Sequence, residues 1–354
     1  MGLNNLFSIY NYYATDYMLG TIFHFGLYYL LFINAFYLYK DGSKYILLNS
    51  QKDNTTISNS LISIQSAENC KGFSETICQL PEIENNKFWN WFAGIIDGDG
   101  NFDIRIDPIS KKKSLKQIRI KLHNRDIRIL TRIQNYLHLG RIRSDKNKPY
   151  SIFIVSDKEN MIYLLNHLNG LIRLKVPNFK EACHIYNIMY KEANYNIELY
   201  DPYYSGLIDT DGSIVYNYSG NRIECNLEFK YNEYTSKLNF NNTIKNSKPF
   251  IIIRKKASKK GGSQNFTSIA FKFQNVNDML FIYDYFMKNR LYSDMKFYRV
   301  SKIKSFIEIR KYKTSTRNSL EHKIYSNFVI DFIKYENPLW YKVPCVDKYL
   351  LYKE

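Results

Sequence analysis

The chain has 354 residues, which is long enough for two compact domains and an extension, since a domain usually takes about 100 to 200 residues. Its 50 Lys and Arg outnumber 33 Asp and Glu, and the net charge of +17 suits a polyanionic partner such as nucleic acid or an acidic membrane surface. The five cysteines are scattered without a C-x-x-C spacing, so neither a disulfide framework nor a zinc site is expected.

Residues 1–86 form an N-terminal extension that differs from the rest of the chain. They carry four Lys, no Arg and seven acidic residues, so the positive excess belongs to residues 87–354. Residues 17–39 have no formal charge and about the length of a membrane-spanning helix, although a buried apolar segment is an alternative. Residues 41–86 are polar and predict a linker.

Composition also bears on where the protein is made. The first 39 residues contain no Lys or Arg, whereas import signals are basic. The many Tyr, Phe, Asn, Ile and Lys residues are those favoured by very AT-rich coding DNA. Both features favour a protein that is encoded and made inside a mitochondrion.

A first domain is predicted over residues 87–200. Its apolar periodicity predicts a helix, two strands, a helix, two strands and two closing helices. The ranges are 88–97 (helix), 101–107 and 117–123 (strands), 126–139 (helix), 141–144 and 151–155 (strands), and 158–168 and 179–190 (helices). In the first strand Phe102, Ile104 and Ile106 are predicted to point inward.

The same order is predicted to recur over residues 201–313. The predicted strands are 213–218, 222–230, 250–255 and 268–274, and the predicted helices are 233–244, 276–288 and 302–311. Residues 314–354 form a tail with a helical stretch near 320–335. The sequence therefore predicts an α+β fold of two similar halves, each with the order αββαββα.

An internal repeat opens each half. Trp91-Phe-Ala-Gly-Ile-Ile-Asp-Gly-Asp-Gly100 and Tyr203-Tyr-Ser-Gly-Leu-Ile-Asp-Thr-Asp-Gly212 share five of ten residues, including both acids. Small residues at helical spacing would let the two helices pack backbone to backbone: Ala93, Gly94 and Gly98 in one, Ser205, Gly206 and Thr210 in the other. Gly100 and Gly212 suit the turn from each helix into the next strand. This packing would place Asp99 beside Asp211.

Two adjacent carboxylates repel each other unless a cation lies between them. Oxygen ligands on an open site suit Mg²⁺ (or Mn²⁺), which can activate water and stabilise a phosphorane during phosphodiester hydrolysis. A calcium-binding EF-hand is the competing interpretation of D-x-D-G. It fails in both copies, because that loop needs Gly at position six and Glu at position twelve, where Phe102 and Pro108, or Ile214 and Gly220, stand.

The two motifs resemble the paired signatures of a single-chain LAGLIDADG homing endonuclease, and the likeness extends over about residues 87–312. The resemblance implies two pseudo-symmetric domains forming a DNA-binding saddle, with the motif helices at their interface and two antiparallel sheets in the major groove. It implies that Asp99 and Asp211 bind divalent metals, assisted by the carbonyls of Gly98 and Thr210, while Asp97 and Asp209 are structural.

The resemblance also implies further site residues. A basic residue late in each half assists near the scissile phosphate in such enzymes, and Lys175 and Lys296 stand in comparable places, although an ordinary surface lysine is the alternative. A polar residue after the second strand of each half often orders water in the family, which makes Asn124 and Asn232 candidates.

Outward-facing polar residues of the strands form the expected DNA-reading surface, since Arg, Lys, Asn and Gln pair with base edges in the major groove. They are Arg105, Gln117, Arg119, Lys121, Arg141 and Arg143 in the first half, and Arg222, Asn226, Lys230, Arg254, Lys272 and Gln274 in the second. Loop lysines 111–113, 255, 256, 259 and 260 are expected to contact phosphates. A solvated polar face is the alternative, and Asp103, Glu224 and Glu228 weaken the bias of charge.

These features predict a monomeric, metal-dependent endonuclease that cuts double-stranded DNA at a long site, and the resemblance implies that it mediates homing of its own intron. An RNA maturase, which helps its group I intron RNA to splice, is the main alternative, and both activities in one protein are compatible with the sequence. A membrane-attached protein with an inactive nuclease fold is a third possibility, suggested only by residues 17–39.

Overall fold

The computed structural model describes residues 82–144, 146–256 and 266–349. The proposed membrane segment, residues 17–39, lies outside them. Among the described helices none is long and apolar enough to cross a membrane.

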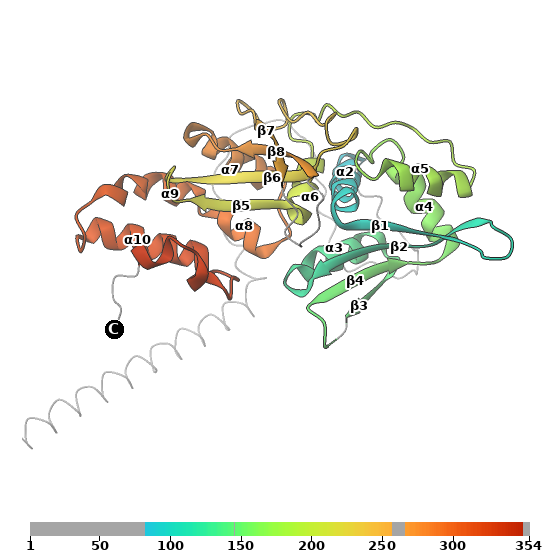
Figure 1. Cartoon of the computed structure of the whole chain (residues 1–354), viewed down its shortest axis with the longest axis horizontal. Coiled ribbons are helices and arrows are strands. Elements are labelled where there is room, and N and C mark those ends of the chain that lie inside the picture. The colour runs from blue at the N-terminus through green and yellow to red at the C-terminus, as the bar shows by residue number, and fades with distance from the viewer. Residues whose placement is uncertain (1–81, 145, 257–265, 350–354) are drawn as a thin grey trace, which may run out of the picture. The chain divides into compact units, whose positions relative to one another are not determined.

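The first half is built on a four-stranded antiparallel sheet with the strand order β1-β2-β4-β3 (Figure 1). Helix α2 (Glu82–Asp99) leads directly into β1 (Gly100–Ile106), followed by β2 (Lys113–His123), β3 (Arg141–Ser144) and β4 (Tyr150–Val155). Helix α3 (Ile127–Leu137) connects β2 to β3, and α4 (Lys158–Leu168) and α5 (Val176–Ile185) follow the sheet. The predicted order of elements in this half is confirmed.

The second half repeats the arrangement around a sheet with the order β5-β6-β8-β7. Helix α6 (Tyr203–Thr210) precedes β5 (Gly212–Asn217), β6 (Arg222–Lys230), β7 (Phe250–Lys256) and β8 (Phe266–Phe273). Three helices follow: α7 (Met279–Lys288), α8 (Asp294–Ser301) and α9 (Ile303–Ile309). The prediction of an α+β fold with two antiparallel sheets is confirmed, whereas α8 was not predicted.

The predicted helix 233–244 is wrong, because residues 231–249 form turns instead. Asn232 Oδ1 accepts the backbone N–H groups of Tyr234 and Thr235, which is the local bonding by which Asn competes with helix formation. Backbone groups of this segment also form hydrogen bonds with the chain that joins the two halves. Ile197 N–H, for example, donates to Asn239 O at 3.0 Å. The second half therefore lacks the counterpart of α3.

Strand faces follow the predicted alternation with two exceptions. Phe102 is buried, but the β1–β2 register shifts between Asp103 and Ile104, and Ile106 near the strand end is 58% exposed rather than inward. Glu224 was predicted to face outward, and it lies on the polar face but is only 4% exposed. Its carboxylate accepts hydrogen bonds from Arg222 and Asn217 at 2.8 and 2.7 Å, so neighbouring side chains cover it.

The tail packs against the second sheet. Helix α10 (Leu320–Lys334) carries Tyr325, whose hydroxyl lies 2.7 Å from that of Tyr216 on β5. The Tyr216 hydroxyl is also 2.9 Å from that of Tyr349, so three buried or half-buried hydroxyl groups satisfy one another. The predicted helix near 320–335 is confirmed, and the tail completes the core of this half.

Candidate metal and DNA-binding site

Helices α2 and α6 lie in direct backbone contact, as the small residues predicted (Figure 1). A Cβ added at Gly94 would lie 2.3 Å from Tyr203 O, and one added at Gly206 would lie 2.1 Å from Trp91 O. At the C-terminal end of the pair, a Cβ at Gly98 would lie 2.0 Å from Thr210 Oγ1. No larger side chain fits at these crossing points, so glycine here sets how closely the helices approach.

The first acid of each motif joins the two helices reciprocally. Trp91 Nε1 donates to Asp209 Oδ2 at 3.0 Å, and Tyr203, which holds the same place in the second motif, donates its hydroxyl to Asp97 Oδ2 at 2.8 Å. Sequence reasoning missed both aromatic donors, although their shared place at the start of the repeat was a signal.

Backbone N–H groups complete the surroundings of these acids. Asp97 accepts from Arg173, Leu174 and Lys175 at 2.8 to 3.0 Å, and Asp209 accepts from Tyr292 and Ser293. Burial raises the pKa of Asp209 to about 6 and also raises that of Asp97, while these hydrogen bonds oppose the effect. Both carboxylates are thus committed to protein groups, which fits the structural role expected of them.

The second acids, Asp99 and Asp211, stand at the adjoining C-terminal ends of α2 and α6. Burial raises the pKa of both carboxyl groups, and the charge of Asp211 raises the pKa of Asp99 further. Lys175 and Lys296 act in the opposite direction on both. Within the described part of the chain, neither carboxylate has a hydrogen bond or an ion pair. The pair therefore favours a nearby cation, unlike Asp97 and Asp209.

Lys175 and Lys296 reach the backbone at the ends of the motif helices. Lys296 Nζ donates to the carbonyls of Ile208, Asp209 and Thr210 at 2.8, 2.8 and 3.0 Å. Lys175 Nζ donates to the carbonyl of Gly98 at 2.7 Å and to that of Gly100. Each lysine therefore caps the negative end of a helix dipole, and burial lowers the pKa of both ammonium groups.

The donor set fits a hard divalent cation that keeps much of its hydration. The carbonyls of Gly98 and Thr210 each already accept one lysine hydrogen bond, but a carbonyl oxygen has a second lone pair. Within residues 82–349 as described, no cluster of three or more His, Cys, Asp or Glu side chains is placed to hold a metal. Two carboxylates with carbonyls, waters and substrate phosphates is the pattern that Mg²⁺ favours over a closed protein cage.

The first sheet brings its predicted reading residues onto one face. Arg119 on β2 and Arg141 on β3 flank Ile154, and Lys121 and Arg143 flank Ile152 in the same way. Three residues near β1 instead form a local network: Asp103 accepts from Arg105 Nη2 and Gln117 Nε2, each at 3.0 Å. The negative charge of Asp103 is therefore neutralised by Arg105 on the same face.

The second sheet carries a similar but more mixed face. Lys230 and Arg254 flank Ser268, and Asn226 lies opposite Lys272. Arg222 is bound to Glu224, and its Nη2 lies 3.5 Å from Gln274 Oε1. The twelve predicted residues thus gather on two sheet faces, with Arg222 partly neutralised. Lys113 pairs with Glu181, the side chain of Lys255 is exposed, and Lys259 and Lys260 lie outside the described residues.

The side chains of Asn124 and Asn232 are engaged in local structure rather than at the acids. Asn124 Nδ2 donates to Lys148 O at 3.0 Å, and its Oδ1 accepts from Ser151 Oγ at 2.8 Å. Asn232 caps the turn described above. Asp126 is a further carboxylate that the sequence did not single out. It accepts from Ser293 Oγ at 2.6 Å across the two halves, and its charge raises the pKa of Asp99.

Residues 92–186 match the LAGLIDADG endonuclease family. The chain is 28% identical over 185 residues to the intron-encoded RNA maturase bI4 of Saccharomyces cerevisiae, covering 51% of this chain and 28% of that protein. It is 25% identical over 269 residues to the intron-encoded DNA endonuclease ai2a of Dictyostelium discoideum, covering 72% of this chain and 80% of that protein.

A probable intron-encoded endonuclease 4 of Neurospora crassa is 29% identical over 148 residues, 39% of this chain and 26% of that protein. The chain thus spans only about a quarter of the maturase and of the Neurospora crassa protein. The solved LAGLIDADG homing endonuclease I-GzeII, in complex with its DNA target, is similar with a TM-score of 0.45 and 14% identity, covering 70% of this chain and 99% of that one. The family match over residues 92–186, together with two motif helices in contact, makes this chain similar to LAGLIDADG endonucleases.

Proposed function

We propose that this protein is a site-specific endonuclease that hydrolyses both strands of a long double-stranded DNA target with Mg²⁺ or Mn²⁺. The observation that carries the proposal is the pair Asp99 and Asp211, two carboxylates without a protein partner among the described residues, held beside each other by touching helices. LAGLIDADG endonucleases use divalent metal ions. The two halves, residues 87–200 and 201–313, act as two domains of one monomer.

The residues around the pair have distinct roles in this proposal. Asp99 and Asp211, with the carbonyls of Gly98 and Thr210, hold the cation, which when bound lowers the pKa of water and offsets charge on the scissile phosphate. Lys175 and Lys296 hold positive charge beside the acids. They also fix the carbonyls at the helix ends, so they orient ligands in addition to any contact with phosphate.

The two sheet faces read the target. Arg119, Arg141 and Arg143 in the first half present guanidinium groups suited to bidentate contacts with guanine. In the second half Asn226, Lys230 and Lys272 offer amide and ammonium donors along neighbouring strands. Because β1 and β5 begin directly after the motif acids, a duplex on these sheets brings its backbone to Asp99 and Asp211.

The test uses the full chain with plasmid that carries the intronless insertion site of the host gene, in the presence of Mg²⁺. The intact protein is expected to cut both strands, and Asp99→Asn and Asp211→Asn are expected to lose at least about 100-fold in rate while retaining DNA binding. Asp107→Asn, an exposed acid in the β1–β2 turn, is the matched control and is expected to cut normally. No cutting by the intact protein, or undiminished cutting by both site variants, rules out the proposal.

A second function, assistance of intron splicing as an RNA maturase, is supported by the similarity to maturase bI4 over 185 residues. Several of the similar proteins are named as intron-encoded, which supports an intron in an organellar genome as the source and a mitochondrion as the place of action. A splicing assay with the host intron RNA tests this function. Splicing at an equal rate with and without the protein refutes it.

A further inference from the structure

A basic and aromatic cavity lies at the opposite end of the motif helices from the acids. It has a volume of about 230 Å³ and is lined by residues near the N-terminal ends of α2 and α6 together with α3 and the segment after α7. Trp91 lies eight residues before Asp99 on α2, so the cavity is roughly 12 Å or more from the acid pair, at about 1.5 Å per helical residue. It therefore does not belong to the proposed metal site.

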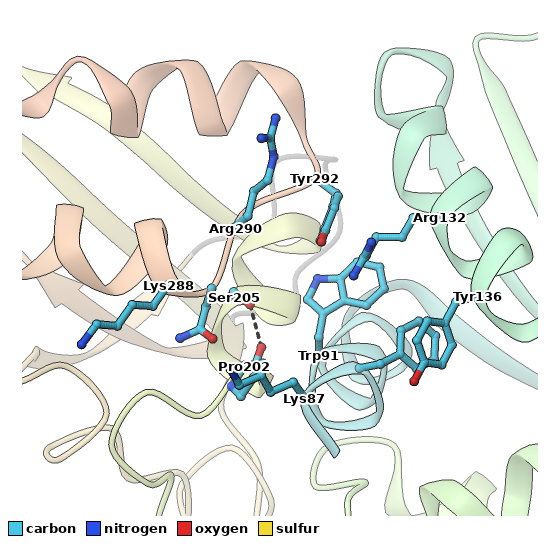
Figure 2. Close-up of a pocket in the computed structure, with 11 residues that line it drawn as sticks. Lys87, Trp91, Arg132, Tyr136, Pro202, Ser205, Lys288, Arg290 and Tyr292 are labelled. Atoms are coloured by element: carbon cyan, nitrogen blue, oxygen red, sulfur yellow. Dashed lines mark hydrogen bonds between the residues drawn. The ribbon is translucent and has the colours of Figure 1, made fainter. Parts of the chain in front are cut away.

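The lining combines cations with aromatic rings from both halves. Lys87, Arg132, Lys288 and Arg290 contribute positive charge, and Phe88, Trp91, Tyr136 and Tyr292 contribute rings. Figure 2 shows Trp91, Arg132 and Tyr292 close together, with Lys288 and Arg290 extending away from them at the edge. Lys87, Lys288 and Arg290 are exposed, so they are available to an anion that approaches from solvent.

Arg132 occupies the central place in this arrangement. Its guanidinium carbon lies 4.1 Å from the centre of the Tyr292 ring and 5.8 Å from that of Trp91. Its Nε atom is buried and has no hydrogen-bond partner among the described residues. A buried donor without an acceptor is costly, so an acceptor that reached this atom as the side chain adjusts would stabilise the site.

A second cavity of about 390 Å³ continues the first along α3. The two share Arg132, Tyr136 and Tyr292, and the second adds Arg128, Thr131 and Asn135. None of the described residues that line the two cavities is acidic, although Arg128 is paired with the nearby Asp294 at 2.6 Å. The result is a positively charged groove along one face of α3, which we call the α3 groove.

We infer that the α3 groove binds unpaired nucleotides of RNA, with phosphate oxygens on Arg132 and the surrounding cations and bases against the aromatic rings. Single-stranded nucleic acid is recognised by this combination, because every phosphate carries charge and every base has a stacking face. The larger cavity, of about 390 Å³, has room for only about 13 waters of about 30 Å³ each, which suits a nucleotide rather than a duplex. The inference deepens the proposed maturase function and does not depend on DNA cleavage.

The test measures binding of the full chain to a fluorescein-labelled 15-nucleotide oligouridylate RNA by anisotropy over a range of salt concentrations, without divalent metal. The variant Lys288→Gln/Arg290→Gln removes two exposed cations of the groove. The matched control Lys245→Gln/Lys248→Gln removes two exposed lysines beside a different cavity, with the same change in net charge. Arg132→Gln tests the buried donor, and its urea midpoint reports whether it folds.

The groove variant is expected to bind RNA at least about tenfold more weakly. The slope of log Kd against the logarithm of the salt concentration is expected to fall by about 1.4, because two phosphate contacts on a single strand are lost. The control is expected to bind as the intact protein does. Equal weakening by both double variants would mean that only overall charge matters, and would overturn the inference.

Two further probes separate the other nucleic acids. The variant Arg119→Gln/Arg141→Gln on the first sheet is expected to weaken binding of a 30-base-pair DNA duplex and to leave RNA binding unchanged. RNA binding that is lost in this sheet variant, or a 15-nucleotide thymidylate DNA that binds as tightly as the RNA, contradicts the assignment. These experiments measure binding and not cleavage, so a negative result would reject the RNA-binding inference without bearing on the proposed endonuclease activity.

Discussion

The contact between Gly98 and Thr210 offers a sharp test of how helix packing positions the acids. A Cβ added at Gly98 would lie 2.0 Å from Thr210 Oγ1 and 2.6 Å from Thr210 Cβ, whereas ordinary contacts lie at 3.4 to 4 Å. Rotation of Thr210 is opposed, since its hydroxyl bonds to the carbonyls of Gly206 and Leu207 at 3.2 and 3.1 Å. Gly98→Ala must therefore push the helix ends apart by roughly 1 Å.

Overpacking of this kind costs about 1–3 kcal/mol of unfolding free energy. The effect on cleavage is expected to be larger, because Asp99 and Asp211 directly follow the two clashing residues and a misplacement of about 1 Å lowers a rate by about 100-fold. The backbone carbonyls at both positions are unchanged by the substitution, so lost metal ligands are not an alternative explanation.

A second substitution provides the control. Thr210→Gly removes the clashing atoms, so Gly98→Ala/Thr210→Gly leaves room on the second helix for the methyl group added to the first. Thr210→Gly alone is expected to cost up to about 1 kcal/mol through helix propensity. The double variant is expected to recover most of the stability and activity that Gly98→Ala loses, with a coupling free energy of at least about 1 kcal/mol.

Urea unfolding followed by tryptophan fluorescence measures stability, since Trp89, Trp91 and Trp340 all lie in the described part of the chain. Plasmid cleavage measures activity on the same preparations. If the effects of the two substitutions are additive, the helices do not touch at this point. That result would contradict the proposed placement of the acids.

Three further outcomes follow from the same geometry. Tyr203→Phe is expected to lower the free energy of unfolding by about 1.5–3 kcal/mol, because Asp97 loses a buried donor. The control is Tyr204→Phe, whose hydroxyl contacts only the Cys225 sulfur, and it should lower the free energy of unfolding by less than half as much when both are measured by urea unfolding. Lys296→Met is expected to raise the pKa of Asp99 and Asp211, so the acid limb of the pH–rate profile moves to higher pH; an unmoved limb would contradict this coupling. Calorimetric Ca²⁺ binding is expected to be weaker at pH 5 than at pH 7.5 and to release protons, because carboxyl groups with raised pKa values are partly protonated at low pH and must ionise to bind metal; affinity that does not change with pH would argue against both acids as ligands.

Much of the fold is determined by local pattern. The alternation in β2, with Ile118, Ile120 and Leu122 inward, is a property of the strand itself and appears in the structure. The repeated small residues of the motifs similarly imply a close helix pair, because only small side chains allow such contact. Sequence periodicity failed at residues 233–244, where Asn side chains and the chain joining the halves compete for the backbone hydrogen bonds a helix would use.

The sequence by itself determined that two acidic motifs recur in one basic chain, and a pair of carboxylates was predicted from them as the metal site. Only the tertiary structure decided which protein groups bind each acid. Asp97 and Asp209 accept hydrogen bonds from aromatic side chains and backbone N–H groups of distant segments. Asp99 and Asp211 have no such donors among the described residues and are influenced by each other and by two lysines. The physical reason is that the partners of Asp97 and Asp209 lie 76 to 118 residues away along the chain, where no local pattern reports them.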